Sequence, residues 1–185
     1  MVGTPQTREQ AHVLQLDDIE EGLHEIHFEI GADALEVAPK DLQFSGPLQV
    51  RLTVGRTLQY FCIEGHIEAQ VQGECCRCLE PAQQQISGIM KLMLQRKEAD
   101  EDELEAIADE DEVDIVDPGT RKYDLGERVR DVIVLEIPLR LYCAKDCQGL
   151  CSSCGRNLNE GSCDCSDSTV DTRWEALAQL NENKN

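Results

Sequence analysis

Closely spaced cysteines near the C-terminal end constrain this chain most strongly. Six of its ten cysteines fall between Cys143 and Cys165, in the order C-AKD-C-QGL-C-SS-C-GRNLNEGS-C-D-C. Cys151-x2-Cys154 has the spacing of a knuckle that binds one ion through two thiolates, and Gly155 relieves the tight bend after it. Cys163-x-Cys165 adds a second close pair. Four thiolates in a tetrahedron favour zinc.

The remaining cysteines allow a second site. Cys143 and Cys147 either replace a member of the first set or contribute to another site, and Cys75-x2-Cys78 lies upstream, directly after a predicted strand. Eight cysteines suffice for two four-thiolate sites, one holding Cys75 and Cys78 with two of the six. The predicted metal ligands are Cys143, Cys147, Cys151, Cys154, Cys163, Cys165, Cys75 and Cys78. Closed sites of this kind stabilise a fold and do not catalyse.

Two other interpretations of the cysteines stay open. Disulfides or redox chemistry are alternatives for the six-cysteine cluster, although a reducing compartment disfavours structural disulfides. Cys75-x2-Cys78 alone is a weak signal and also occurs in redox proteins, but no βαβ pattern precedes it here, and Glu74 would raise a thiol pKa. We expect Cys62 to be a small buried hydrophobic residue and Cys76 a spare thiol.

The charge distribution indicates the kind of partner. The net charge is −20, and twelve acidic residues with no basic one lie in Glu98–Asp117. Such a field repels nucleic acid and attracts a basic protein. The polar N-terminus and the lack of an apolar run near the ~20 residues of a membrane span predict a cytoplasmic protein with no membrane contact.

Alternating apolar residues predict several strands. The runs AHVLQL and HEIHFEI suggest two strands before residue 41, and Leu48–Val54 alternates cleanly. We expect a turn at residues 55–57, a strand over Leu58–Glu64, a break or bulge at Gly65, and a strand over His66–Gln72. Residues 83–95 are ambiguous, and we prefer a strand because the preceding segments form a meander.

Two helices are predicted, and with the strands they give an α+β fold class. Asp124 caps a helix that carries the apolar stripe Val129, Val132, Ile133 and Ile137 and ends at Pro138. A second helix starts near residues 171–172. We expect an antiparallel β-meander packed on the first helix, followed by a cysteine-rich, zinc-binding C-terminal region. The predicted divisions are a mostly β region (1–97), an acidic loop or linker (98–120), a core helix and strand returning to the main domain (121–142), and the zinc region with its terminal helix (143–185).

Catalytic motifs are missing from the sequence. It contains no Ser-His-Asp order, GxSxG, HExxH or Walker-type loop. The four histidines stand among polar residues, and we expect surface imidazoles. His24 and His27 are three apart and face opposite ways on a strand. The prediction is that the protein is not an enzyme.

Three stretches of the sequence resemble one family. They are CRCLEP at residues 76–81, DLGERVRDVIVLEIPLRLYC, and CAKDCQGLCSSCGRNLNEGSCDC followed by DTRWEALAQL. They look like the YceD family, whose members are described as large ribosomal RNA subunit accumulation proteins. The order of landmarks covers roughly residues 48–180. Where the family often has Pro after the first knuckle cysteine, this chain has Ser152, which removes a turn constraint but no ligand.

The resemblance implies a role in making or stabilising large-subunit ribosomal RNA. The family's gene commonly neighbours one for a small basic protein of the large subunit. Because the chain is acidic, we expect an indirect role through a basic ribosomal protein or a pre-ribosomal large subunit. Direct RNA contact by Arg77, Lys145 and Arg156, and redox sensing by Cys75, Cys76 and Cys78, are the alternatives. Oligomeric state and the role of the acidic loop, shield or solubilising linker, stay open.

Overall fold

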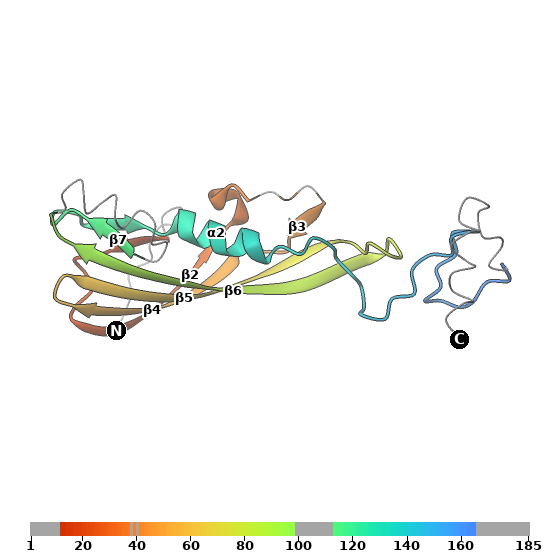
Figure 1. Ribbon diagram of the computed structural model, residues 1–185, viewed down its shortest axis with the longest axis horizontal. Helices are drawn as coiled ribbons and strands as arrows, with labels where there is room; N and C mark the ends of the chain where they lie inside the picture. Colours follow the sequence, from red (N-terminus) through yellow and green to blue (C-terminus); the bar gives the residue numbers. More distant parts are fainter. Residues whose placement is uncertain (1–11, 38, 40, 99–112, 166–185) are drawn as a thin grey trace, which may run out of the picture.

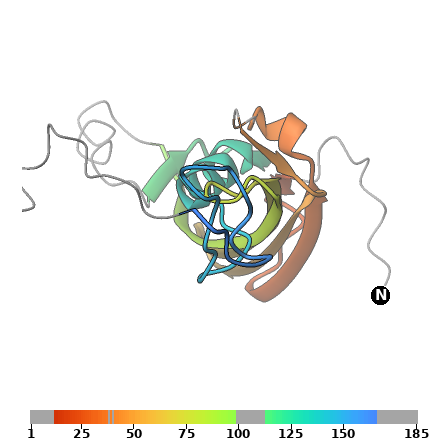
Figure 2. The ribbon, with the colours of Figure 1, turned by 90° about the vertical axis from the view of Figure 1, so that its right-hand side faces the viewer.

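A long curved sheet with one helix on its inner face forms the body of the protein (Figure 1). The computed structural model describes residues 12–37, 39, 41–98 and 113–165. Seen along the long axis, the strands form an arc around the core (Figure 2). The cysteine-rich loops extend from one end of the sheet. The mostly antiparallel sheet with one helix confirms the predicted fold class in outline, and the helix predicted near residues 171–172 lies outside the described residues.

The main sheet has six strands. In spatial order they are β2 (Gly22–Ile30), β4 (Leu48–Thr57), β5 (Tyr60–Glu74), β6 (Pro81–Arg96) and β7 (Val113–Val116), while β3 (Leu42–Phe44) pairs with the far end of β5. A separate pair joins β1 (Val13–Gln15) to β8 (Lys122–Asp124), and the helices are η2 (Ala32–Leu35) and α2 (Gly126–Glu136). β7 runs parallel to β6. The sheet is therefore mixed, although the predicted meander of the first half, β4–β5–β6, is antiparallel.

The apolar alternation in the sequence reports which face of each strand is buried. The alternate residues Leu48, Val50, Leu52 and Val54 of β4 are all buried. The two strands predicted before residue 41 correspond to β1 and β2, and the ambiguous segment at residues 83–95 is a strand, as preferred. The inner face of the sheet packs against α2 to make one aliphatic core.

Strand boundaries in the centre of the sheet differ from the prediction. Residues 55–57 belong to β4, and the turn to β5 consists of Leu58 and Gln59, since Thr57 pairs with Tyr60. Leu58 adopts φ +53° there without being glycine. Gly65 does not break a strand but lies buried inside β5. A Cβ at Gly65 would come within 2.9 Å of Leu52 Cδ2, so glycine provides room for side-chain packing.

The end of the predicted acidic loop is a strand, which corrects the assignment of residues 98–120 to a loop. Val113–Val116 pairs with Met93–Arg96 of β6. The charge of Asp114 is compensated, because Arg128 Nη2 lies 2.7 Å from Asp114 Oδ1 and the Tyr123 hydroxyl donates to Asp114 Oδ2. Burial and the neighbouring Asp114 raise the pKa of Tyr123 to about 12. Repulsion among the like charges of this segment predicted a solvated loop. That prediction did not take into account Arg128, which lies outside the acidic segment and neutralises Asp114.

Helix α2 ends before Pro138 as predicted, but its N-cap is Leu125, one residue after the predicted Asp124. The N–H of Gly126 donates to Asp124 Oδ1 at 2.7 Å, so this carboxylate satisfies one free donor at the helix start. Val129 and Ile133 of the predicted stripe are buried, and Val132 and Ile137 pack against the core. The helix approaches β6 most closely at Gly88, where a Cβ would lie 2.5 Å from Val132 Cγ1. In the described residues, no helix is long and apolar enough to cross a membrane.

We expect Gly88→Ala to destabilise the protein by about 1–3 kcal/mol, because the added methyl group forces α2 away from β6. Urea unfolding measures the change. Gly55→Ala is the matched control on the same sheet, since a Cβ there would be 3.8 Å from Leu23 Cδ1, an ordinary contact. Equal stability of the two variants would show that the helix is not seated against Gly88.

Candidate metal centres

Four cysteines from two distant parts of the chain meet at the end of the sheet. Cys75 and Cys78 lie in the turn between β5 and β6, and Cys143 and Cys147 lie in the loop that follows α2. We call this set site 1. Cys75, Cys78 and Cys147 are buried in a small apolar cluster with Ala82 and Leu141, while Cys143 is exposed. Site 1 therefore joins the cysteine-rich loops to the sheet.

The sulfur separations in site 1 suit a tetrahedral metal ion. Cys75 Sγ lies 3.8 Å from Cys147 Sγ, and Cys78 Sγ lies 3.5 Å from Cys143 Sγ. All four sulfurs are within 4.8 Å of one another. With Zn–S bonds of about 2.3 Å, the sulfurs of a tetrahedral site are about 3.8 Å apart. The separations are far longer than the ~2.05 Å of a disulfide bond.

The other four cysteines form site 2. Cys151, Cys154, Cys163 and Cys165 also bring their sulfurs within 4.8 Å of one another. The structure thus assembles all eight cysteines predicted as ligands into two sets of four, and assigns Cys143 and Cys147 to the set with Cys75 and Cys78. The identity of the metal stays a prediction from the four-thiolate donor set.

Both sites contain a knuckle of the same form. In site 2, the N–H of Gly155 donates to the carbonyl of Cys151 at 2.9 Å, and Gly155 has φ +74°. In site 1, the N–H of Leu79 donates to the carbonyl of Cys75 at 2.9 Å, and Leu79 has φ +63°. The predicted role of Gly155 in the bend is consistent with this geometry. Leu79 adopts the same left-handed conformation at a steric cost that glycine avoids.

The two sites are connected by hydrogen bonds. Asn159 lies between the cysteine pairs of site 2, yet its Nδ2 donates to Cys147 Sγ of site 1 at 3.3 Å. Its Oδ1 accepts from the N–H of Gln148 at 2.8 Å. The N–H of Leu150 donates to the carbonyl of Arg77 at 3.1 Å. Such contacts orient the ligands of a metal site and lower the basicity of a thiolate they touch.

The side chain of Arg77 also supports site 1. Its guanidinium group lies over the Tyr142 ring, 4.8 Å from the centroid, and donates to the carbonyl of Cys147 at 2.9 Å. The alternative hypothesis gave this residue a phosphate contact. Its observed contacts tie the turn after β5 to the loop after α2.

The pKa values of the cysteines differ widely within each set. Backbone donors, first the N–H of Cys78, lower the pKa of Cys75 to about 6, while the neighbouring sulfurs of Cys78 and Cys147 raise that of Cys143 to about 12. In site 2, the N–H groups of Cys154 and Ser153 lower the pKa of Cys151 to about 6, and the Cys154 sulfur raises that of Cys165 to about 12. A thiolate raises the pKa of the cysteine beside it, because two neighbouring negative charges repel each other. A bound divalent cation would remove this repulsion.

Of the two cysteines outside the sites, one is placed as expected and the other is not. Cys62 is exposed on the outer face of β5, so the prediction of a buried Cys62 is wrong. Its neighbours Phe61 and Ile63 face the core instead. Cys76 is exposed between two ligands, as expected for a spare thiol. Within the described residues, neither four-cysteine set includes a histidine.

Sequence reasoning missed Asn159 and Leu79. Asn159 has no motif of its own, and only its place inside the cysteine loop hinted at a supporting role. Leu79 follows Cys78 just as Gly155 follows Cys154, so the shared register of the two knuckles was visible in the sequence. The usual preference for glycine at this position hid the likeness.

We expect Leu79→Gly to stabilise the protein by about 1 kcal/mol, because glycine adopts positive φ without the Cβ penalty. Gly155→Ala should destabilise site 2 by a similar amount, although a Cβ there meets nothing within 4 Å. Thermal unfolding of the metal-loaded variants provides the measurement. Opposite shifts support the shared knuckle, whereas a destabilised Leu79→Gly variant would contradict it.

Comparison with known proteins identifies relatives of this chain. The profile of the family described as "Large ribosomal RNA subunit accumulation protein YceD" matches residues 63–181. An Arabidopsis thaliana protein named large ribosomal RNA subunit accumulation protein YCED homolog 1, chloroplastic, is 27% identical over 77% of this chain and 51% of its own length. The protein of the same name from Zea mays is 30% identical over 64% of this chain and 48% of its own.

A third relative is an uncharacterised protein of Mycobacterium tuberculosis, 29% identical over 72% of this chain and 61% of its own length. The chain spans about half the length of the two plant relatives. No solved structure matches the chain significantly. The matched residues include all eight cysteines of sites 1 and 2. The resemblance seen in the sequence is confirmed, and the chain belongs to the YceD family.

Proposed function

We propose that this protein is a non-enzymatic ribosome-assembly factor that supports accumulation of large-subunit ribosomal RNA by binding a basic ribosomal protein, free or in a pre-ribosomal large subunit. Family membership carries the proposal, since the family and its plant members are named for this process. The cytoplasm is the proposed compartment, because its reducing conditions keep thiols available for metal.

The charge of the chain favours a protein partner over RNA. With a net charge of −20, the chain attracts cationic surfaces and repels phosphate. Asp114 is neutralised by Arg128, but the segment 99–112 alone contributes nine acidic residues and no basic one. A segment with this composition competes with ribosomal RNA for the basic surface of a ribosomal protein.

In this proposal the two cysteine sites hold zinc as a structural cofactor. Four thiolates fill a tetrahedral ion, which leaves no position for a substrate or water. The loop from Cys143 to Cys165 has few buried apolar residues, so metal–sulfur bonds replace a hydrophobic core there. Zinc at site 1 also fixes the loop against the turn after β5.

We expect the purified protein to carry two zinc ions per chain. Cys78→Ser should reduce the content to one, and Cys76→Ser, a neighbouring cysteine outside the sites, should leave it at two. Metal analysis with native mass spectrometry gives the stoichiometry. A chain isolated without metal, or equal losses in the two variants, would contradict the assignment of site 1.

Chelation of the metal should also unfold the cysteine-rich loops while the sheet persists. Hydrogen exchange is expected to accelerate from residue 143 onward and to stay slow in β5, whose buried residues belong to the main core. Unchanged exchange after proven metal loss would show that the loops fold without it.

The proposed partner is tested by a tagged pull-down from cells, with half of the sample treated with ribonuclease. A basic large-subunit protein should stay bound after RNA digestion. Replacing the nine acidic residues of 99–112 by Asn and Gln should weaken its binding at least tenfold, because the electrostatic attraction is lost. This variant keeps the connection between β6 and β7 at its natural length.

A variant with the residues of 99–112 in shuffled order is the control, since it retains the charge and should retain binding. Loss of every bound protein with the RNA would overturn the proposal and favour direct RNA binding. Unaltered affinity of the neutralised variant would assign the acidic segment the role of a solubilising linker.

A further inference from the structure

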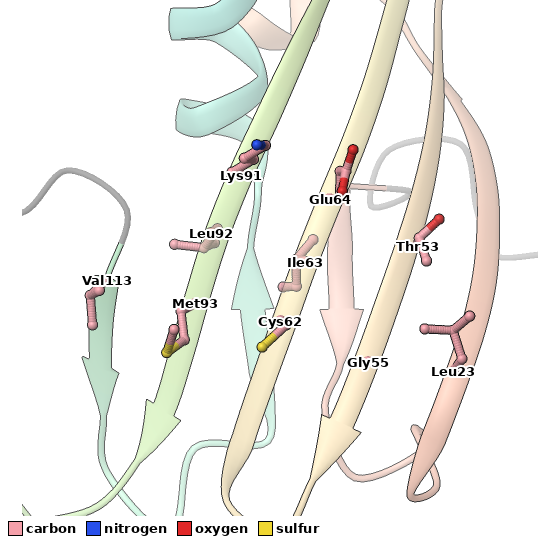
Figure 3. A pocket seen from close by; sticks show the side chains of 10 residues that line it. All are labelled: Leu23, Thr53, Gly55, Cys62, Ile63, Glu64, Lys91, Leu92, Met93 and Val113. Carbon is pink, nitrogen blue, oxygen red and sulfur yellow. The ribbon is translucent and has the colours of Figure 1, made fainter.

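An apolar row crosses the outer face of the sheet, opposite the core. The residues Leu23, Gly55, Cys62, Met93 and Val113 are successive register partners on β2, β4, β5, β6 and β7. Figure 3 shows the side chains of Leu23, Cys62, Met93 and Val113 across neighbouring strands, with Gly55 between Leu23 and Cys62. These residues line a groove with a volume of about 400 Å³, and we call it the outer groove.

The exposure of this row is unusual for the solvent face of a sheet. Leu23 is 74% exposed and Met93 40% exposed, although an outer face normally carries polar residues. The next row along the strands is polar and consists of Glu25, Thr53, Glu64 and Lys91. The apolar residues therefore form one line across the sheet, and Ile89, two rows further along β6, is exposed on the same face but lies apart from that line.

The composition of the groove suits an adaptable apolar contact. Gly55 leaves a hollow, because a Cβ there would be 3.8 Å from Leu23 Cδ1 and 3.9 Å from the Cys62 carbonyl. Met93 and Cys62 contribute polarizable sulfur, and an unbranched methionine adjusts to the shape of a partner. A volume near 400 Å³ is in the usual range for a binding pocket.

Charge identifies the partner. Glu25, Glu64 and Lys91 lie in the adjacent row, so two carboxylates outweigh one ammonium group there, and the nine acidic residues of 99–112 directly precede Val113 in the sequence. A segment that fills the groove thus meets a net negative charge in the adjacent row, on a chain whose net charge is −20. The matching chemistry is apolar side chains flanked by lysine and arginine.

We propose that the outer groove binds an amphipathic basic segment of the partner protein. This inference rests on the proposed function and locates the partner on the molecule. Apolar anchors in the groove supply affinity that charge alone cannot, and acidic residues beside it orient the basic flank.

Alkylation of Cys62 tests the proposal directly. The zinc-loaded full chain is mixed with RNA-free proteins extracted from purified large ribosomal subunits, treated briefly with iodoacetamide, and digested for mass spectrometry. Binding should slow the alkylation of Cys62 at least fivefold. Cys76 is exposed outside the groove and serves as the internal reference, so its rate should not change. Polylysine tests charge alone and should leave the Cys62 rate unchanged.

Leu23→Gln provides the matching variant. Because Leu23 is exposed, the substitution should leave the fold intact, yet it removes apolar contact and should weaken binding of the retained protein about tenfold. Leu139→Gln is the control, since Leu139 is fully exposed and does not line the groove.

The outcomes separate this inference from the proposed function. A bound basic protein that leaves Cys62 unprotected, or binds Leu23→Gln as tightly as the parent chain, overturns the groove and keeps the function. If Cys62 is protected when the chain associates with itself, a second copy of the chain occupies the groove. If deletion of residues 99–112 speeds the alkylation of Cys62, that segment occupies the groove. Either result overturns the proposal. Failure of any ribosomal protein to bind overturns both.

Discussion

The antiparallel pairing of β5 with β6 is the interaction on which the rest of the structure depends. It joins fifteen residue pairs, from Tyr60 with Gln95 to Glu74 with Pro81. At one end the hairpin extends beyond β4, so the turn after β5 projects from the sheet with Cys75 and Cys78 in it. On its inner face it forms the floor of the core under α2, and on its outer face it carries Cys62 and Met93, two of the five residues of the apolar row.

Site 1 joins the C-terminal loops to the end of this hairpin, because two of its cysteines come from each. Those loops could not be held by apolar burial, since the small cluster around site 1 contains little more than Ala82 and Leu141 besides three cysteines. Sulfur–metal bonds suit such a region because their strength does not depend on buried area. The hydrogen bond from Asn159 to Cys147 then links site 2 to site 1.

An acidic stretch of the sequence is followed directly by a strand that lines the outer groove. Asp114 lies in β7 and pairs with Arg128. The nine acidic residues before Val113 carry a large part of the net charge of −20. The outer groove ends at that same strand. The basic partner that we propose would use both features, because charge steers the encounter and apolar contact slows dissociation.

The sequence by itself determined which residues share a face and which chemistry the cysteines offer. Alternation in β4 and the stripe on α2 predicted the core, because local periodicity fixes side-chain direction. The close spacing of Cys151, Cys154, Cys163 and Cys165 predicted a four-thiolate set, because short loops keep residues that are near in sequence near in space. Only the tertiary structure decided that Cys143 and Cys147 join Cys75 and Cys78 and that Val113–Val116 runs parallel to β6. These outcomes depend on pairings between residues far apart in the chain, and no local pattern encodes the register of such pairings.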